Sequence, residues 1–236
     1  MLQIFLYYFL LFIVYAFLGW IIEVIVFFRK SKKFINRGFL IGPYCPIYGV
    51  CAVLMVLTFG RYVSTPIAMF VMAGVVCTIF EYLTSVIMEK LFNARWWDYS
   101  NEPFNVNGRV CLHNSIAFGL LGVLLLYYVN PFIENTLHSI PQVILIIFSC
   151  LLLFIFIADI ITSFNVISRV KDTTNSILKD NTEEITEKVI EKVTEKVKDI
   201  LSKRSILTKR LVEAFPDLKA IWVKQKEKIK EQISRK

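Results

Sequence analysis

The sequence lacks the short motifs on which many nucleotide-binding and hydrolytic sites are built. It contains no G-x-x-x-x-G-K-[ST], so this chain cannot cradle nucleotide phosphates in the manner of a P-loop. It contains no H-E-x-x-H, G-x-S-x-G or D-x-D, and its 2 histidines argue against zinc chemistry. These absences predict no metal and no cofactor, and they give little support to an enzymatic activity.

Cysteines are few, and their pattern excludes two common uses. The 5 cysteines include no C-x-x-C pair, and their odd number argues against a disulfide framework. Most lie within apolar runs, where cysteine behaves as a small hydrophobic residue. The five positions are Cys45, Cys51, Cys77, Cys111 and Cys150. We expect them to pack as core residues rather than to bind metal or form cross-links.

Apolar residues are abundant and occur in long runs. The chain is 56% hydrophobic with a mean hydropathy of +0.59, well above a typical soluble domain. A helical run of about 20 apolar residues crosses roughly 30 Å of hydrocarbon. Five such runs are predicted, over residues 4–28, 39–60, 66–89, 111–130 and 140–166. The sequence thus predicts an all-α polytopic membrane protein, with a five-span membrane domain over 1–167 and a basic, helical tail over 168–236.

Basic residues between the runs predict the orientation. Lys and Arg are concentrated after the first run, after the third run and in the tail, whereas the loop between the fourth and fifth runs has neither. Cationic loops stay in the cytoplasm, so we expect the N-terminus outside and the C-terminus inside. A basic cluster after the first run, with none before it, favours a permanent anchor over a cleaved signal peptide. The formal net charge of +8 accompanies no nucleic-acid motif, so the expected partner is the lipid bilayer and not nucleic acid.

The start of the second run has an unusual composition. Gly42, Pro43, Pro46 and Gly49 fall within eight residues, which disfavours a regular first helical turn. One interpretation is irregular backbone buried in protein or lining a cavity. The other is that the prolines only start a helix at the interface, where proline is tolerated.

Carboxylates interrupt three of the runs at comparable depth. Glu23, Glu81 and Asp159 are each expected in the inner half of a span, where ionisable groups are costly and usually functional. Glu81, Ser85 and Glu89 are spaced by four and share one helix face. The complete candidate polar site comprises Glu23, Arg37, Glu81, Glu89, Asp98, Asn107, Arg109, His113 and Asp159.

These polar and aromatic residues also have structural interpretations. Carboxylates within spans can specify packing through hydrogen bonds between helices. Asp98 lies near Arg95 and Arg109 in sequence, and a structural ion pair would account for it. Trp96 and Trp97 follow a span directly, a position typical of anchors at the lipid headgroups.

Several short motifs, in order along the chain, carry a family resemblance. They are Gly19-Trp20-Ile21-Ile22-Glu23, Asn36-Arg37-Gly38-Phe39-Leu40-Ile41-Gly42-Pro43, Pro46-Ile47-Tyr48-Gly49, Glu81-Tyr82, Glu89, Trp96-Trp97-Asp98-Tyr99-Ser100 and Phe104-Asn105-Val106-Asn107-Gly108-Arg109. Together they cover roughly residues 10 to 132, and the sequence resembles the ABC-transporter type IV permease family, also called the CmpB family. The resemblance implies a multi-span bacterial plasma-membrane protein that serves as a permease-like transport component. Its ATPase would then be a separate subunit, and because five spans are few for a transport pathway, we expect a homodimer.

Two other functions remain open at the level of sequence. One is a membrane scaffold or sensor that acts through its cytoplasmic tail. The other is a membrane-embedded lipid-modifying enzyme, with Glu23, Glu81 or Asp98 as general base and Arg37 and Arg109 holding a phosphate.

The tail shows a heptad-like pattern of apolar residues. The seam consists of Ile190, Val193, Val197, Ile200, Leu207 and Leu211, interrupted by Arg204. This spacing predicts one helix, ending near Pro216, that can form a two-stranded coiled coil. The alternative is an amphipathic helix on the membrane surface, which the Lys-rich segment 203–236 suits better than the Glu-rich segment before it.

Overall fold

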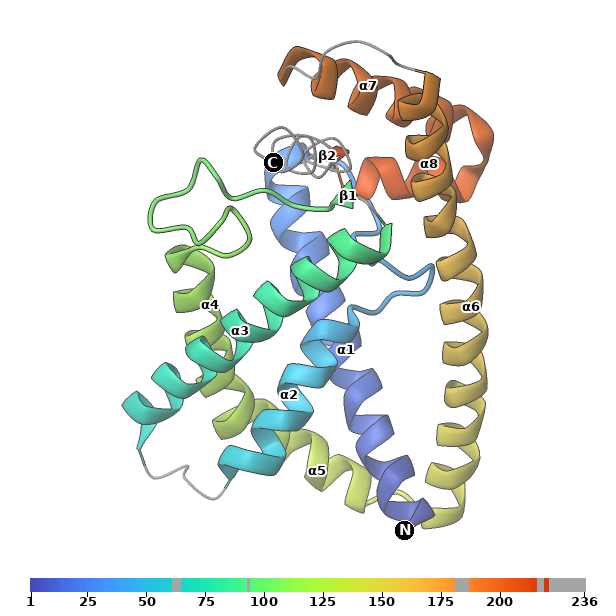
Figure 1. Ribbon diagram of the computed structural model, residues 1–236. Coiled ribbons are helices and arrows are strands. Elements are labelled where there is room, and N and C mark those ends of the chain that lie inside the picture. Colours follow the sequence, from blue (N-terminus) through green and yellow to red (C-terminus); the bar gives the residue numbers. More distant parts are fainter. Residues whose placement is uncertain (61–64, 93, 181–186, 216–218, 221–236) are drawn as a thin grey trace, which may run out of the picture.

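The chain folds into a helical bundle with a helical tail at one end (Figure 1). The computed structural model describes residues 1–60, 65–92, 94–180, 187–215 and 219–220. Its helices are α1 (Leu2–Ser31), α2 (Pro46–Phe59), α3 (Pro66–Phe92), α4 (Leu112–Leu124), the π-helix η2 (Leu125–Val129), α5 (Asn130–His138), α6 (Gln142–Asp180), α7 (Glu187–Arg204) and α8 (Ile206–Ala214). A two-residue strand, β1 (Ala94–Arg95), pairs antiparallel with β2 (Lys219–Ala220).

Four helical stretches are long and apolar enough to cross a membrane. They cover Leu2–Arg29, Pro66–Phe92, Leu112–His138 and Gln142–Ser168, with 27 or 28 residues each. At 1.5 Å per residue, each is roughly 40 Å long, which exceeds the roughly 30 Å of a bilayer core. The predicted all-α polytopic membrane fold is therefore confirmed.

The second predicted span, 39–60, is shorter than expected. Its helix begins only at Pro46 and has 14 residues, which gives roughly 21 Å. Pro46 occupies the first turn, where proline costs no hydrogen bond, with Cys45 as the N-cap. Each of the two interpretations is therefore correct for part of this region. Pro46 starts the helix, and the backbone before Pro46 is irregular. The length criterion for a span is met by four helices of the described chain, and α2 falls short of it.

Close helix contacts hold the bundle together at glycines. A Cβ built on Gly49 of α2 would lie 2.6 Å from the backbone carbonyl oxygen of Phe12 in α1. A Cβ on Gly122 of α4 would lie 2.2 Å from the Cβ of Ala73 in α3. Small residues let helix backbones approach in this way, and this approach is a main source of packing energy inside membranes.

Replacing Gly49 by alanine should destabilise the bundle. The added methyl meets both the ring and the backbone carbonyl of Phe12, and the backbone cannot rotate away, so α1 and α2 must separate, at a cost of about 1–3 kcal/mol. The matched control is Gly60→Ala at the end of the same helix, because a Cβ there meets nothing within 4 Å. Melting temperature in detergent measures both. An unchanged value for Gly49→Ala would show that this contact is looser than the structure has it.

The tail folds back onto the membrane domain instead of forming one long helix. The predicted helix through 190–211 is interrupted at Ser205, whose side chain caps α8 in a reciprocal pair with Thr208. Val197 and Leu211, two residues of the predicted seam, are buried in one apolar cluster. The full cluster comprises Phe92, Trp96, Ile167, Val197, Leu201, Leu211, Ala214 and Phe215. The heptad spacing therefore reflects packing within the chain here, while the side chains of Ile190 and Val193 and the segment around Pro216 lie outside the described residues.

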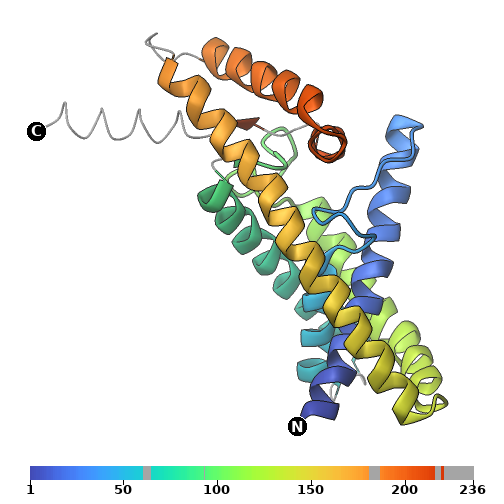
Figure 2. The same cartoon turned by 90° about the vertical axis from the view of Figure 1, so that its right-hand side faces the viewer.

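The two ends of the bundle are distinct. The N-terminus lies at one end, and α7 and α8 lie at the other, beyond the last turns of α3 (Figures 1 and 2). The helix α6 runs along the outside of the bundle, and only 6% of its spanning window is buried. It continues without a break past residue 167 to Asp180, so the predicted boundary between membrane domain and tail falls inside a helix.

Candidate functional site

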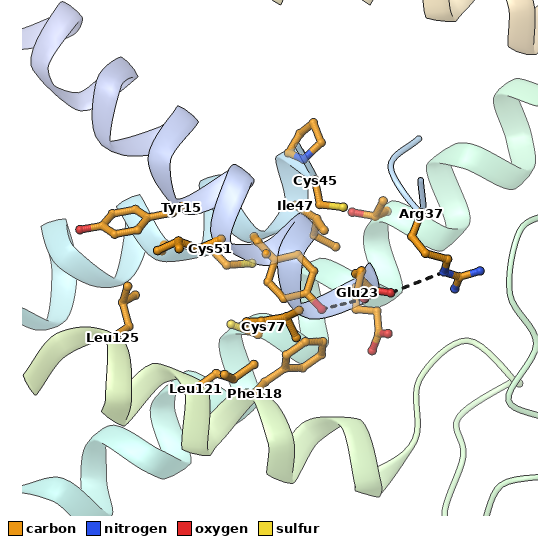
Figure 3. A pocket seen from close by; sticks show the side chains of 18 of the residues that line it. Tyr15, Glu23, Arg37, Cys45, Ile47, Cys51, Cys77, Phe118, Leu121 and Leu125 are labelled. Carbon is orange, nitrogen blue, oxygen red and sulfur yellow. Dashed lines mark hydrogen bonds and ion pairs between the residues drawn. The ribbon is translucent and has the colours of Figure 1, made fainter. Parts of the chain in front are cut away.

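A cavity of about 400 Å³ lies between α1, α2, α3 and α4 (Figure 3). Its walls are mainly aliphatic and aromatic, and residues of the π-helix η2 contribute to one of them. Polar side chains are few, and they gather where the irregular segment before α2 and the loop before α4 close the cavity. They include Glu23, Arg37, Tyr48, Glu81 and Tyr99.

Glu23 and Arg37 form an ion pair at the wall of this cavity. The Arg37 Nε lies 3.8 Å from Oε2 of Glu23, and Tyr48 donates a hydrogen bond of 2.8 Å to Oε1 of Glu23. The guanidinium also lies over the rings of Phe27 and Phe215, at 4.7 and 5.4 Å from the ring centres. These contacts neutralise Glu23 and fix its orientation, because a carboxylate held by both a cation and a hydroxyl has little freedom left.

Glu81 is the most deeply buried carboxylate of the cavity. It is 6% exposed, and its Oε1 accepts hydrogen bonds of 3.3 Å from both Tyr99 and Asn114. Its Oε2 is buried and has no hydrogen-bond partner among the described residues. Burial and the negative charge of Glu81 raise the pKa of Tyr99, so the phenol stays protonated and donates.

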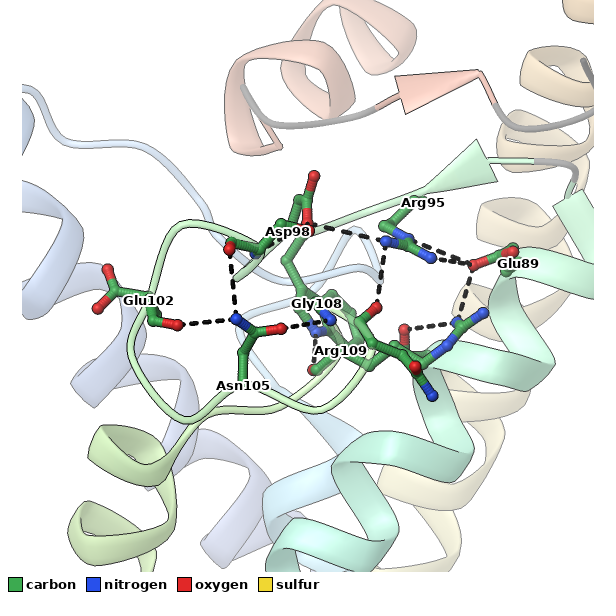
Figure 4. A network of polar contacts seen from close by, with 11 residues as sticks. Glu89, Arg95, Asp98, Glu102, Asn105, Gly108 and Arg109 are labelled. Atoms are coloured by element: carbon green, nitrogen blue, oxygen red, sulfur yellow. Dashed lines mark hydrogen bonds and ion pairs between the residues drawn. The ribbon is translucent and has the colours of Figure 1, made fainter. Parts of the chain in front are cut away.

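Glu89, one turn beyond Ser85, belongs to a separate ion network at the end of α3 (Figure 4). Its Oε2 lies 2.8 Å from Nη1 of Arg109 and 3.4 Å from Nε of Arg95. Arg95 Nη1 in turn lies 3.7 Å from Oδ1 of Asp98. This network fastens the loop between β1 and α4 to the helix, which matches the structural interpretation of Asp98.

The loop itself places Asn107 and Gly108 in left-handed backbone conformations, with φ of 54° and 65°. Asn107 donates a 3.0 Å hydrogen bond to the Tyr82 hydroxyl, and its carbonyl accepts from Arg95 at 3.4 Å. Trp97 donates from Nε1 to the Arg109 carbonyl at 2.9 Å and lines the cavity. The loop residues of the predicted site therefore hold the cavity wall in place rather than entering the cavity.

Asp159 is separated from the other two span carboxylates. Its Oδ1 accepts hydrogen bonds from the Ile41 amide at 3.0 Å and from Ser163 at 2.7 Å. Its Oδ2 accepts from the Gly42 amide at 2.7 Å and from the Tyr44 hydroxyl. Asp159 thus satisfies the irregular backbone before α2, which cannot remain unpaired in a membrane.

The structure therefore divides the predicted residues into three groups. Glu23, Arg37 and Glu81 line one cavity, whereas Glu89, Asp98, Asn107 and Arg109 form its supporting loop network. Asp159 holds the segment before α2. His113 is exposed in the first turn of α4 and lies away from the cavity lining. Among the described residues, no group of three or more His, Cys, Asp or Glu side chains could hold a metal ion.

Several residues that shape the cavity were absent from the predicted site. Tyr48 and Tyr99 donate to the two carboxylates, and Asn114 joins Tyr99 at Glu81. Tyr48 and Tyr99 both lie within the motifs that carry the family resemblance, which was the available signal. The prediction of headgroup anchors is wrong for Trp96, which is 2% exposed in the apolar cluster beneath the tail.

The tail closes the cavity on one side. Phe215 lines it, and Arg37 donates to the carbonyl of Ala214 at the end of α8. Arg210 of α8 donates from Nη1 to the carbonyls of Gly38 and Leu40, at 3.1 and 3.0 Å. One face of α8 is therefore bonded to the same irregular segment that Asp159 holds from the other side.

Comparison with known families agrees with the motifs quoted above. The family model described as "Putative ABC-transporter type IV" matches residues 10–164, a range that begins within α1, includes α2 to α5 and covers most of the spanning part of α6. No curated protein and no solved structure matches the chain. The match covers every element that lines the cavity except the tail and shows that this multi-pass membrane protein belongs to the ABC-transporter type IV family.

Proposed function

We propose that this protein is a permease-like component of a bacterial transport system and that the cavity between helices α1, α2, α3 and α4 is its substrate site. The observation that carries the proposal is a mainly apolar cavity inside the bundle, with the buried carboxylate of Glu81 and the partly buried one of Glu23 in its wall. Ionisable groups placed at membrane depth commonly mark a substrate or ion pathway. Membership of the ABC-transporter type IV family supports a transport-related role.

The proposed setting is the bacterial plasma membrane, with the N-terminus outside and the tail in the cytoplasm. The support is the distribution of Lys and Arg, together with the position of the N-terminus and the tail at opposite ends of the bundle. This orientation requires α2 to complete a crossing with the irregular segment before it. Asp159 makes that arrangement feasible because it pairs the amides of Ile41 and Gly42.

Energy would come from a separate ATPase subunit, since this chain has no P-loop sequence. Such a subunit would contact the cytoplasmic end of the bundle, where the loop before α4 and the tail lie. Homodimerisation through a coiled-coil tail stays a prediction. It would require the tail to leave the described cluster, because Val197 and Leu211 are buried there.

Access from both sides of the membrane tests the transport role. Cys45 lines the cavity, so a chain that keeps Cys45 alone can be treated with an impermeant maleimide in right-side-out and inside-out vesicles. Vesicles should come from cells that retain the natural partner subunits. A substrate pathway that opens alternately should let Cys45 react in both preparations.

Three control positions calibrate this experiment. Glu134→Cys should react only from outside and Lys32→Cys only from the cytoplasm, whereas Ile161→Cys, on the exposed face of α6, should react from neither. Reaction of Cys45 in inside-out vesicles only, under all conditions, would contradict transport. Reversed labelling of Glu134→Cys and Lys32→Cys would contradict the proposed orientation.

A second candidate function is a membrane sensor that reports through its tail. The observation in its favour is that Arg37 contacts both Glu23 in the cavity and the Ala214 carbonyl in the tail. A ligand that drew Glu23 away from Arg37 would let Arg37 move, and this movement would change the contact between Arg37 and the end of α8. One-sided labelling of Cys45 combined with ligand-dependent protease sensitivity of the tail would favour this function over transport.

A further inference from the structure

We infer that the cavity takes an amphiphile bearing a primary or secondary ammonium group, with Glu81 as its counter-ion. The inference rests on the proposed function, because it names the substrate class of the proposed site. Its first support is the Oε2 atom of Glu81. This atom is buried, the whole residue is only 6% exposed, and no described residue donates a hydrogen bond to Oε2. An acceptor left unpaired in this way costs stability unless a ligand supplies the donor.

The balance of charge in the cavity favours a cation. The carboxylate and guanidinium side chains among the cavity-lining residues are Glu23, Arg37 and Glu81. The charges of Glu23 and Arg37 compensate each other at 3.8 Å. Glu81 accepts its hydrogen bonds from Tyr99 and Asn114, which are both uncharged. A buried carboxylate without a cationic partner attracts a cation strongly, because the surrounding medium screens it little.

Arg109, which lies in the loop before α4, is already committed. Arg109 lies 2.8 Å from Glu89 and donates to Ser85, one turn away from Glu81 on the same helix. It does not line the cavity. A bound ligand, rather than a rearranged arginine, is thus the source of charge that the cavity geometry accommodates.

The requirement for an N–H group comes from the hydrogen bond that Glu81 lacks. A quaternary ammonium carries the same charge but has no proton to donate to Oε2. The aromatic residues Tyr48, Trp97, Tyr99 and Phe118 line the cavity as well, and their ring faces stabilise organic cations. They would accept either type of head group, so discrimination between the two falls to Glu81.

The rest of the ligand must be apolar and of modest size. Leu18, Ile22, Met55 and Leu121 are among the apolar residues of its wall. The volume of about 400 Å³ is within the range of pockets for small organic ligands, roughly 300–1,000 Å³, and is too small for a folded partner. A hydrocarbon chain with one amino group meets both conditions, whether it is a free amine or the amino head group of a lipid.

Binding of radiolabelled dodecylamine to the purified full chain in nanodiscs tests the inference. The lipid should be phosphatidylcholine with phosphatidylglycerol, neither of which carries a primary amine. Dodecylamine should bind saturably, and Glu81→Gln should weaken binding at least tenfold, which corresponds to about 1.4 kcal/mol. The matched control, Glu102→Gln, removes an exposed carboxylate from the loop before α4 and should bind like the unaltered chain.

Competing ligands separate charge, hydrogen bonding and source. Dodecyltrimethylammonium should compete at least tenfold more weakly than dodecylamine, and dodecanoate should not compete. Competition by short-chain phosphatidylethanolamine would identify a lipid head group as the source, whereas competition by free amines alone would identify a soluble amphiphile. Equal competition by the quaternary ammonium would overturn the role of the N–H group.

A second variant keeps the inference open to refutation if Glu81→Gln fails to fold. Thr84→Phe adds bulk to the cavity wall and leaves the carboxylate in place, so it too should weaken dodecylamine binding. Unchanged binding in Thr84→Phe, or saturable binding that Glu81→Gln does not affect, would place the amine elsewhere and overturn the inference. No amine binding with two-sided labelling of Cys45 would leave transport standing with another substrate, and the reverse result would leave the ligand class without transport.

Discussion

Asp159→Ala is expected to unfold the region before α2 and to lower the free energy of unfolding by about 2–4 kcal/mol. The variant removes an acceptor for the amides of Ile41 and Gly42 and for the hydroxyls of Tyr44 and Ser163. Hydrogen bonds to charged groups contribute about 1.5–3 kcal/mol each but are not additive within one network. Thermal unfolding in detergent, followed by tryptophan fluorescence, measures the loss.

Two further variants identify the cause. Thr162→Ala, on the exposed face of the same helix, removes a hydrogen bond to the Ala158 carbonyl and should leave stability nearly unchanged. Asp159→Asn keeps one oxygen acceptor and replaces the other, which accepted two hydrogen bonds, by an NH₂ group. Its loss of unfolding free energy should therefore lie between those of the other two variants. If Asp159→Ala had the same melting temperature as Thr162→Ala, the segment before α2 would have to be held by contacts other than this carboxylate.

The membrane part of the fold was predictable because hydrocarbon imposes length and composition. Spans one, three, four and five were found from apolar runs; their starts agree within two residues, and their C-terminal ends lie 1, 3, 8 and 2 residues beyond the predicted ones. Counting 1.5 Å per residue from the span ends placed Glu23 and Glu81 at similar depth, and both line the cavity. Depth in the membrane follows from a residue's position along its helix, so it can be predicted from a single sequence.

What the sequence could not supply is direction around each helix axis and contact between distant segments. Asp159 has the same depth as Glu81, yet it points to the Ile41–Gly42 backbone because α6 lies on the outside of the bundle. Likewise, the heptad-like spacing of Val197 and Leu211 indicates that both side chains are buried but not what buries them. A second chain and the end of α3 would produce the same pattern.

The ring of Trp96 illustrates the same limit. A tryptophan just past a span is typical of the membrane interface, and nothing local distinguishes that setting from a buried one. Its burial depends on Phe39 from the segment before α2 and on Phe215 from the tail, with ring centres 4.7 and 5.2 Å away. Both partners are far away in sequence, so the cluster emerges only in the folded chain.

Releasing the tail should expose the cavity to reagents. The double variant Arg210→Ala with Phe215→Ala removes the hydrogen bonds to the Gly38 and Leu40 carbonyls and the ring that lines the cavity. In a chain that keeps Cys45 alone, maleimide should then react with Cys45 at least tenfold faster in detergent. Two effects act in the same direction, access of the reagent and solvation of the thiolate.

The second effect follows from the present environment of Cys45. The thiol is buried and lines the cavity that the tail closes. Only the thiolate reacts with maleimide, and an apolar cavity solvates a thiolate poorly. Water entering the cavity would therefore increase the rate of reaction.

Lys209→Ala is the matched control, because Lys209 is exposed on the same helix one residue from Arg210. It should label at the rate of the unaltered tail, and circular dichroism should show that the membrane helices remain intact in both variants. Fast labelling of Cys45 with the tail unaltered would mean that the cavity is already open at this end. Slow labelling in the double variant would mean that the segment before α2, held by Asp159, closes the cavity without help from the tail.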